Sequence, residues 1–303
     1  MGIQRGPKVS VGVPVYNGQD YLEACLRGLL AQTFADFEII VSDNASTDTT
    51  ESICRDYAGR DGRIRYVRAE KNQGAAWNYN RVLTLARGDY FKWAAYDDLV
   101  SPDLLEAGVR VLDADPGCVI AFGSAMLIDA EGNEKEVYRE PMHLDSGSPS
   151  ERLQEYLTRV GLTNAMYGLM PTSALRAVGG LGSFVNSDTV MLGAMALRGR
   201  FRELPEVRFY RRLHAKASAP SNPSLAQLAA WFDPRKKGRP VYPAWRHFAE
   251  YASSIRKAPI PWMEKIRCLR VLLSWQRHGL RDLVREGMQA VGGRLPGTGR
   301  VSW

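Results

Sequence analysis

Two adjacent carboxylates, Asp97 and Asp98, end an apolar run in the segment "YFKWAAYDDL" (90–99). Two like charges side by side repel each other, so solvent or a cation must neutralise them. Carboxylate oxygens are the ligands that hard divalent cations prefer, and Mg²⁺ typically takes one or two of them together with substrate phosphates. The pair therefore suggests a cation site, and a polar loop after a strand is the alternative.

Polar side chains also follow two earlier strand-like segments. Tyr16 and Asn17 end the Val-rich segment 8–16, and Asp43 ends the apolar segment 37–43. In an open α/β sheet, ligands bind outside the carboxyl ends of the strands. We therefore expect these groups and the two adjacent acids to converge at one edge of a sheet.

The first 120 residues alternate between strand-like and helix-like segments, which predicts an α/β fold with a mostly parallel sheet flanked by helices. The expected strands are 8–16, 37–43, 63–69 and 90–96, and the expected helices are 20–32, 46–59, 74–88 and 101–116. Capping-box spacing is present at Asp20 and Glu23 and at Asp48 and Glu51. Ser101 is expected to cap a helix that has Pro102 at its first position.

The second part of the chain is less regular. We expect a strand and a turn in 118–134, short helices at 151–160 and 189–198, and amphipathic helices at 224–233, 244–257 and 262–290. This change of pattern divides the chain into a first domain of residues 1–217 and a helical C-terminal region of residues 218–303.

The charge is unevenly distributed along the chain. The chain of 303 residues carries a net +7, whereas residues 235–303 hold 15 Lys and Arg against four Asp and Glu, a net +11. A basic C-terminal region on an acidic body suggests an anionic partner for that region alone. No nucleic-acid motif accompanies it, so we expect no nucleic acid. Tryptophans among the basic segments suggest peripheral contact with an anionic membrane. Packing on the first domain and a homodimer interface are the alternatives.

Cysteine use and hydropathy point to a cytoplasmic protein. The four cysteines are scattered without a CxxC pair, which fits reduced, buried thiols. No apolar run of 18 residues and no N-terminal signal segment occur. The histidines show no metal-ligand spacing, so a dedicated histidine metal site is not expected.

An ordered set of motifs resembles the GT-A catalytic domain of family 2 glycosyltransferases. The set is "VSVGVPVYNG" (9–18), "YLEACLRGLLAQTFADFEIIVSDNASTDTT" (21–50), "NQGAAWNYNRVLTLARGDY" (72–90) and "YDDL" (96–99), and the likeness covers roughly residues 8–215. It implies a GT-A, Rossmann-like fold with a nucleotide-sugar half at about 8–120 and an acceptor half at about 120–217. It also implies a nucleotide-sugar donor, a hydroxyl acceptor and a Mg²⁺ or Mn²⁺ ion that stabilises the leaving diphosphate.

The resemblance assigns donor-binding roles to residues at the strand ends. Asp43 would accept a hydrogen bond from a uracil- or thymine-type base, and the ring of Tyr16 would lie against that base. Tyr16 could equally be an ordinary strand-end aromatic, and Asp43 could support a turn. The other positions carried over for donor binding are Pro14, Val15, Asn17, Asn72, Gly74, Asn80, Tyr96, Asp97, Asp98 and Arg212.

The metal site departs from the family pattern. Asp97 matches the second acid of the DxD motif, the usual metal ligand, but Ala95 replaces the first acid. Asp98 would then support or take over part of the coordination. Arg212 and His214 match a basic cluster that contacts the diphosphate or the metal, and a surface basic run is the alternative.

Asp188 occupies the position of the catalytic base in the resemblance. A carboxylate there can take the proton from an acceptor hydroxyl as it attacks the anomeric carbon, and direct displacement inverts the configuration. The alternative is that Asp188 caps the helix that follows it.

The sequence therefore predicts an inverting, metal-dependent glycosyltransferase that uses a UDP- or dTDP-sugar. Two rivals remain. A non-catalytic nucleotide-sugar-binding protein of the same fold is suggested by Ala95. A sugar nucleotidyltransferase is disfavoured because the segment after the first strand, "PVYNGQDYL", has no basic residue to hold a triphosphate. The sugar and the acceptor, whether glycan, lipid-linked or secondary metabolite, stay open.

Overall fold

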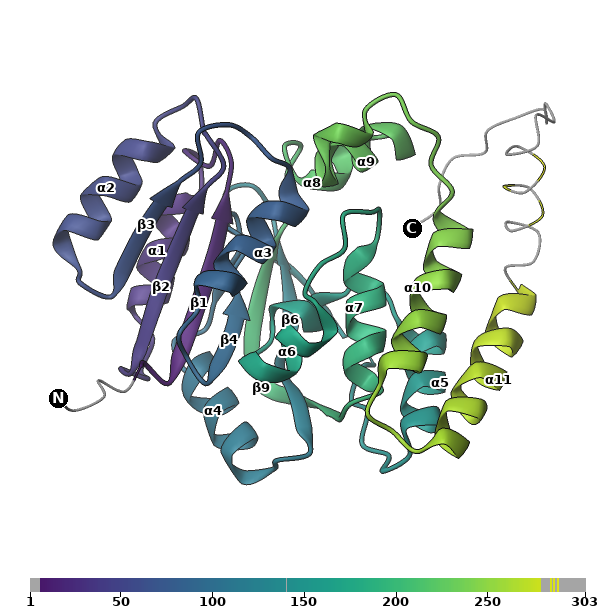
Figure 1. Cartoon of the computed structure of the whole chain (residues 1–303). Coiled ribbons are helices and arrows are strands. Elements are labelled where there is room, and N and C mark those ends of the chain that lie inside the picture. Colours follow the sequence, from purple (N-terminus) through teal and green to yellow (C-terminus); the bar gives the residue numbers. More distant parts are fainter. Residues whose placement is uncertain (1–5, 140, 279–283, 285, 287, 289–303) are drawn as a thin grey trace, which may run out of the picture.

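The structure is a computed structural model that describes residues 6–139 and 141–278 and, beyond them, Val284, Glu286 and Met288 (Figure 1). Two sheets lie at the centre, and helices cover both faces of the larger one. The predicted α/β fold with a mostly parallel sheet and a helical C-terminal region is confirmed. The part of the helix predicted beyond residue 278 lies largely outside the described residues.

The first sheet has five strands in the order β3-β2-β1-β4-β8. The first four run parallel, and β8 pairs with β4 antiparallel. The strands are β1 (Val9–Val15), β2 (Phe37–Asp43), β3 (Ile64–Arg68), β4 (Tyr90–Trp93) and β8 (Met170–Pro171). Because β1, β2 and β4 are parallel neighbours, their carboxyl ends lie along one edge, as the sequence predicts.

Successive side chains along the strands pack on opposite faces of this sheet. Ile39 and Val41 of β2 belong to a core shared with α1 and α4, whereas Ile40 between them belongs to the core on the opposite face, shared with α3. Side chains that alternate along a strand bury both faces when helices lie on each side. The helices of this part are α1 (Leu22–Leu30), α2 (Thr50–Arg60), α3 (Ala75–Leu85) and α4 (Leu104–Ala114).

The second sheet has four strands in the order β5-β9-β6-β7. These are β5 (Leu99–Val100), β9 (Arg200–Arg212), β6 (Cys118–Ile128) and β7 (Glu134–Tyr138). The short β5 follows the two adjacent acids directly and pairs with β9 through Leu99 and Tyr210. This pairing brings the end of β9, with Arg212, to the turn after β4.

The remaining helices form the second half of the molecule. They are α5 (Pro149–Arg159), η1 (Asn164–Tyr167), α6 (Thr172–Val178), α7 (Ser187–Ala196), α8 (Ser218–Ser221), α9 (Leu225–Phe232), η2 (Pro234–Lys236), α10 (Pro243–Lys257) and α11 (Trp262–His278). Tyr251 and Ile255 of α10 and Cys268 and Leu272 of α11 belong to the same buried cluster as Tyr156 of α5. The C-terminal helices therefore share their core with the part that precedes them.

Several helix starts differ from the prediction. Helix α1 has Tyr21 as its N-cap without a side-chain cap, because Asp20 forms an ion pair with Lys216 instead. Asp48 accepts hydrogen bonds from the backbone of Gln19 and Thr50 and is not the N-cap of α2. The prediction of a cap at Ser101 is also wrong.

Helix α4 starts at Leu104 with Asp103 as N-cap, so Ser101 and Pro102 lie in the loop before it. The expected strand 90–96 ends earlier, at Trp93. In the described part of the chain no helix is both long and apolar enough to span a bilayer. All four cysteines are free and buried.

Candidate functional site

Three loops meet at the carboxyl edge of the first sheet. The loop after β1 touches the loop after β4 at Gly18, where an added Cβ would lie 2.9 Å from the ring of Tyr96. The ring of Tyr21 lies edge-on to His214, with 4.7 Å between centroids, and 4.7 Å from the guanidinium of Arg212. The end of β9 thus closes this edge, and the predicted convergence is present.

Asp97 is paired with a histidine at this edge. Its Oδ2 lies 2.9 Å from Nε2 of His214, while the imidazole Nδ1 is buried without a hydrogen-bond partner. The Asp97 side chain keeps 17% of its surface exposed, against 3% for His214. The carboxylate therefore faces the edge, and the imidazole lies behind it and orients it.

Asp98 points the other way, into the protein. Its Oδ1 accepts a hydrogen bond of 2.8 Å from the backbone N–H of Arg212. Burial, and then the charge of Asp97, raises the pKa of Asp98 well above its usual range. The two adjacent acids are thus distinguished by their surroundings, one facing the edge and one held inside.

The side chain of Arg212 is occupied by backbone carbonyls. Its Nε donates to the carbonyl of Asp97 at 2.9 Å, and its Nη1 donates to the carbonyls of Asp129 and Ala130 at 3.1 and 2.9 Å. This geometry ties the turn at Asp97 and Asp98 to the turn after β6. Arg212 is buried, so its contact to a diphosphate stays a prediction that would need these bonds to change.

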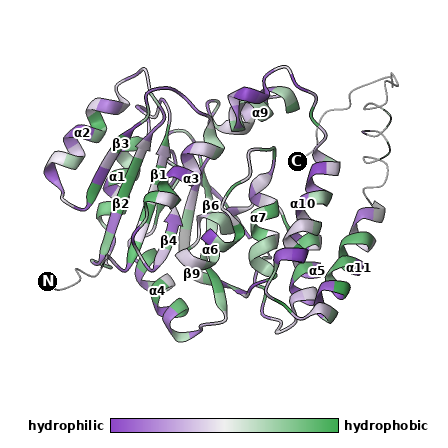
Figure 2. Ribbon diagram, in the orientation of Figure 1, coloured by the Kyte–Doolittle hydropathy of each residue, from purple (hydrophilic) through white to green (hydrophobic). Residues whose placement is uncertain are grey.

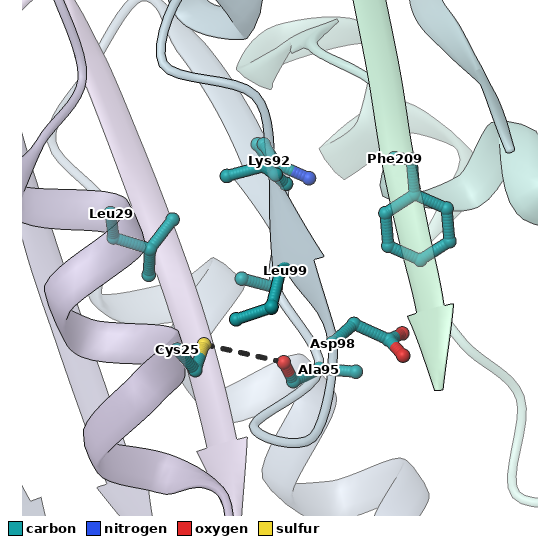
Figure 3. Close-up of a pocket in the computed structure, with 9 residues that line it drawn as sticks. Cys25, Leu29, Lys92, Ala95, Asp98, Leu99 and Phe209 are labelled. Carbon is teal, nitrogen blue, oxygen red and sulfur yellow. Dashed lines mark hydrogen bonds between the residues drawn. The ribbon is translucent and has the colours of Figure 1, made fainter. Parts of the chain in front are cut away.

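A small cavity lies beside Asp98 (Figure 3). Ala95 lines it, and its carbonyl accepts a 3.4 Å contact from the Cys25 thiol. Lys92 of β4 also lines it and donates to the carbonyls of Trp93, at 3.0 Å, and of Tyr167. Ala95 therefore faces a buried space rather than the open edge, where a metal-binding acid would have to be.

The predicted base pocket is only partly open. Tyr16 is exposed, whereas Pro14 and Val15 are buried in β1. Asn17 has a left-handed backbone, and its Oδ1 accepts from the backbone of Thr47 at 2.8 Å. The exposed ring of Tyr16 is the aromatic surface of this segment on which a planar base could stack.

Asp43 is fully buried and its carboxylate is occupied. Oδ1 accepts from the backbone of Ser46 at 2.7 Å, and Oδ2 accepts from the hydroxyl of Tyr66 at 2.8 Å and from the guanidinium of Arg68. Arg68 also donates to the carbonyl of Ser46 at 2.8 Å. A base could reach Asp43 only after Arg68 moves aside.

Asparagines on α3 and in the loop before it have different neighbours. The side-chain oxygen of Asn72 accepts hydrogen bonds from Asn44 at 3.0 Å and from the backbone N–H of Gly74 at 2.9 Å. Asn72 and Gly74 therefore lie beside the end of β2. Asn80 points elsewhere: its amide exchanges hydrogen bonds of 2.7 and 2.9 Å with the backbone of Leu181.

Asn78 bridges the strand ends instead, and sequence reasoning missed it. Its Nδ2 donates to the carbonyls of Val15 at 3.2 Å and Ser42 at 2.8 Å. The signal was available, since Asn78 is four residues before the buried Val82 and so lies on the buried face of α3. It holds the ends of β1 and β2 together.

Asp188 lies in the first turn of α7, whose N-cap is Asn186. The alternative that Asp188 is the N-cap is therefore wrong. Its Oδ2 accepts a 2.7 Å hydrogen bond from the hydroxyl of Thr163, which has a left-handed backbone. The Thr163 turn is in turn held by Arg211, which donates to Leu162 and Asn164 at 2.8 and 2.7 Å.

The loop that leads to Asp188 is held by the C-terminal helices. His247 of α10 lies with Nε2 2.8 Å from the carbonyl of Val185, which requires the imidazole to donate. The hydroxyl of Tyr251, also on α10, donates to the carbonyl of Thr189 at 3.2 Å. Sequence reasoning assigned these residues no role, because the contacts join segments about 60 residues apart.

The residues present fit a cation that arrives with a diphosphate. Among the described residues, no group of three or more His, Cys, Asp and Glu is arranged to hold a metal ion. Asp97 supplies a partly exposed carboxylate, and His214 supplies the hydrogen bond that orients it. One or two protein carboxylates with phosphate oxygens are sufficient for Mg²⁺.

The element order and the two sheets define an α/β protein with a fold of the GT-A type. S. aureus TarS 1–349 in complex with UDP-GlcNAc has a TM-score of 0.66 at 19% identity, over 89% of this chain and 72% of that one. The mannosyltransferase PcManGT from Pyrobaculum calidifontis, in complex with GDP-Man and Mn²⁺, has a TM-score of 0.53 at 19% identity, over 95% and 85% of the chains. At these identities the likeness establishes the fold alone.

The sequence profile of glycosyl transferase family 2 matches residues 10–177, more than half of the chain, and the chain belongs to this family. A glycosyltransferase of Rickettsia conorii is 34% identical over 177 residues, which is 56% of this chain and 28% of the relative. Chondroitin synthase of Escherichia coli is 31% identical over 131 residues, 43% of this chain and 19% of the relative. The chain thus spans less than a third of the length of these relatives.

Proposed function

We propose that this glycosyltransferase moves a sugar from a UDP- or dTDP-sugar to an acceptor hydroxyl, with inversion and with a divalent cation. One observation carries the proposal. Arg211 and Arg212, neighbours at the end of β9, hold the Thr163 turn that contacts Asp188 and the turn of Asp97 and Asp98. The acceptor-side carboxylate and the donor-side carboxylate are thus fixed by one strand end.

Each of the site residues would have its own role in binding or catalysis. The ring of Tyr16 would stack on the base, and Asp97, oriented by His214, would hold Mg²⁺ or Mn²⁺. When bound, that ion would neutralise charge that develops on the leaving diphosphate. Asp188, oriented by Thr163, would accept the proton of the acceptor hydroxyl as that oxygen attacks the anomeric carbon. A single displacement of this kind inverts the anomeric configuration.

The proposed base of the donor follows from the carboxylate at Asp43 and from the fold shared with TarS. The acid at Asp43 favours a base with an N–H donor, as in uracil or thymine, and TarS is known in complex with UDP-GlcNAc. PcManGT binds GDP-Man, so the donor panel must include GDP-sugars. The acceptor would be a glycan, a lipid-linked molecule or a secondary metabolite. A cytoplasmic location without a nucleic-acid partner is part of the proposal.

Donor turnover and donor binding should be measured separately on the same variants. We expect Asp188→Asn to lower turnover of the donor about 10²- to 10⁴-fold, the usual contribution of a general base, while UDP still raises the melting temperature. Asp97→Ala should abolish the additional stabilisation that Mn²⁺ gives to the UDP complex and should reduce turnover more than Asp98→Ala does. Asp36→Asn, a change at an exposed residue in the loop before β2, is the control.

Two results would contradict the proposal. If the wild type turns over no UDP-, dTDP- or GDP-sugar and Asp188→Asn does not differ from it, the chain is a binding protein and not a catalyst. If Mn²⁺ stabilises the UDP complexes of the wild type and of Asp97→Ala equally, Asp97 is not the cation ligand.

A further inference from the structure

Helix α11 packs against the rest of the molecule through one face only. It lies at the outer edge, beside α5 and α10 (Figure 1). Cys268 and Leu272 are fully buried on this face, and Trp275 meets the ring of Tyr251 with 5.9 Å between centroids. The other face of α11 has no described element against it.

That outward face is apolar along the helix. Trp262, Leu269 and Leu273 are exposed, and with the half-buried Ile266 they recur at the spacing of one helical face. Trp262 has 68% of its surface exposed and Leu273 56%. Val284 and Met288, beyond the end of α11, are also exposed. We call the set Trp262, Ile266, Leu269 and Leu273 the α11 stripe; Figure 2 shows hydrophobic turns of α11 at this edge.

The charges that border the α11 stripe are basic. Arg256 and Lys257 end α10 and are exposed next to the start of α11, and Lys265 and Arg270 flank the stripe itself. The acid of this turn, Glu264, is directed inward, where it accepts hydrogen bonds from the backbone of Ser150 and the hydroxyl of Ser148. Over residues 235–303 the net charge is +11.

We propose that the α11 stripe and its basic border bind an anionic lipid surface. An amphipathic helix with an exposed Trp and apolar side chains on one face and Lys and Arg at its borders can lie in the interface plane of a membrane. A second copy of the chain fits this face less well, because two stripes placed together would bring Lys265 and Arg270 of both copies close to each other. An anionic lipid surface can bury the apolar stripe, and its negatively charged headgroups can pair with the basic border.

Vesicle co-sedimentation with the full chain tests the proposal. The probes are vesicles of phosphatidylcholine alone and of phosphatidylcholine with phosphatidylglycerol. We expect binding to the second kind only, decreasing as salt is raised. Leu269→Glu/Leu273→Glu should abolish pelleting, and Lys265→Glu/Arg270→Glu should weaken it by more than about fivefold for each basic residue removed. Val137→Glu on β7 and Arg110→Glu on α4, both exposed, are the matched controls and should pellet like the wild type.

Each other outcome overturns the proposal. The proposal is wrong if the wild type stays in the supernatant with both kinds of vesicle. It is also wrong if Leu269→Glu/Leu273→Glu pellets as much as the wild type. If the stripe variant instead turns a dimer into a monomer in light scattering, with no vesicle binding by the wild type, the stripe is an interface between copies. Hydrolysis of a UDP-sugar in solution should be the same in all these variants, so the result is independent of the proposed catalytic roles.

Discussion

Lys92 is a buried cation in a strand whose neighbours are Phe91 and Trp93. Burial lowers the pKa of Lys92 to about 8, and the nearby Asp98 acts against that shift. Its ammonium group donates to two backbone carbonyls. Its positive charge favours the ionised form of Asp98. A single charged residue inside the run "YFKWAA" was the sequence signal for this role, and it was missed.

Replacement of Ala95 by aspartate should not restore a cation ligand. The new carboxylate would enter the small cavity beside the buried Asp98. A buried, unpaired charge is strongly unfavourable, so we expect Ala95→Asp to lower the melting temperature by several degrees, equivalent to about 1–3 kcal/mol. Mn²⁺ affinity of the UDP complex, measured by calorimetry, should not increase. A variant with unchanged stability and tighter Mn²⁺ binding would show that residue 95 faces the open edge.

The four parallel strands of the first sheet could be predicted within a few residues, whereas the two-residue β8 was not predicted. Parallel strands that are buried on both faces read as continuous apolar runs, and β1 and β2 do so. The helix caps could not be predicted as well. Asp20 has the right spacing for a capping box, but its partner, Lys216, is 196 residues away in the sequence. Local patterns carry no information about such a partner.

In the candidate site, too, residues placed by the order of elements could be predicted, and contacts made through the tertiary fold could not. Asp97 directly follows the expected strand 90–96, so its place at the edge could be predicted from the order of elements. The contacts of Asp188 could not, because Thr163 and the C-terminal helices reach it through the tertiary fold. Asn78 and Asn80 differ by two positions on one helix, and Asn78 rather than the predicted Asn80 contacts the strand ends.

His247 should influence the proposed base through the loop before α7. The imidazole donates to the carbonyl of Val185, three residues before Asp188. We expect His247→Ala to lower kcat about tenfold while KM for the donor changes little, since a misplaced catalytic group reduces the rate more than donor binding. His247→Gln, which can still donate, should recover part of the rate. An equal loss in both variants, or a change in KM alone, would contradict the positioning role.

The whole molecule depends on the C-terminal helices for its core. The predicted first domain of residues 1–217 would lose Tyr251, Ile255, Cys268 and Leu272 from the largest buried cluster. We therefore expect a 1–217 fragment to aggregate or to unfold without a cooperative transition, because exposure of several large apolar side chains costs about 1.5–3 kcal/mol for each. Solubility and calorimetry of the fragment against the full chain measure this. A soluble fragment with the melting temperature of the full chain would show that 1–217 is an independent domain.

Gly74 has a left-handed φ of 89°, and an added Cβ would lie 2.5 Å from the carbonyl of Phe232. The C-terminal region therefore crosses directly over the start of α3, beside the donor-side loop. The family match, residues 10–177, ends before Asp188 and well before Phe232. A chimera that exchanges only the matched segment between two members of this family would combine the donor-side loop of one member with the C-terminal region of the other. To transplant donor specificity, residues 225–257 would have to be exchanged together with the matched segment.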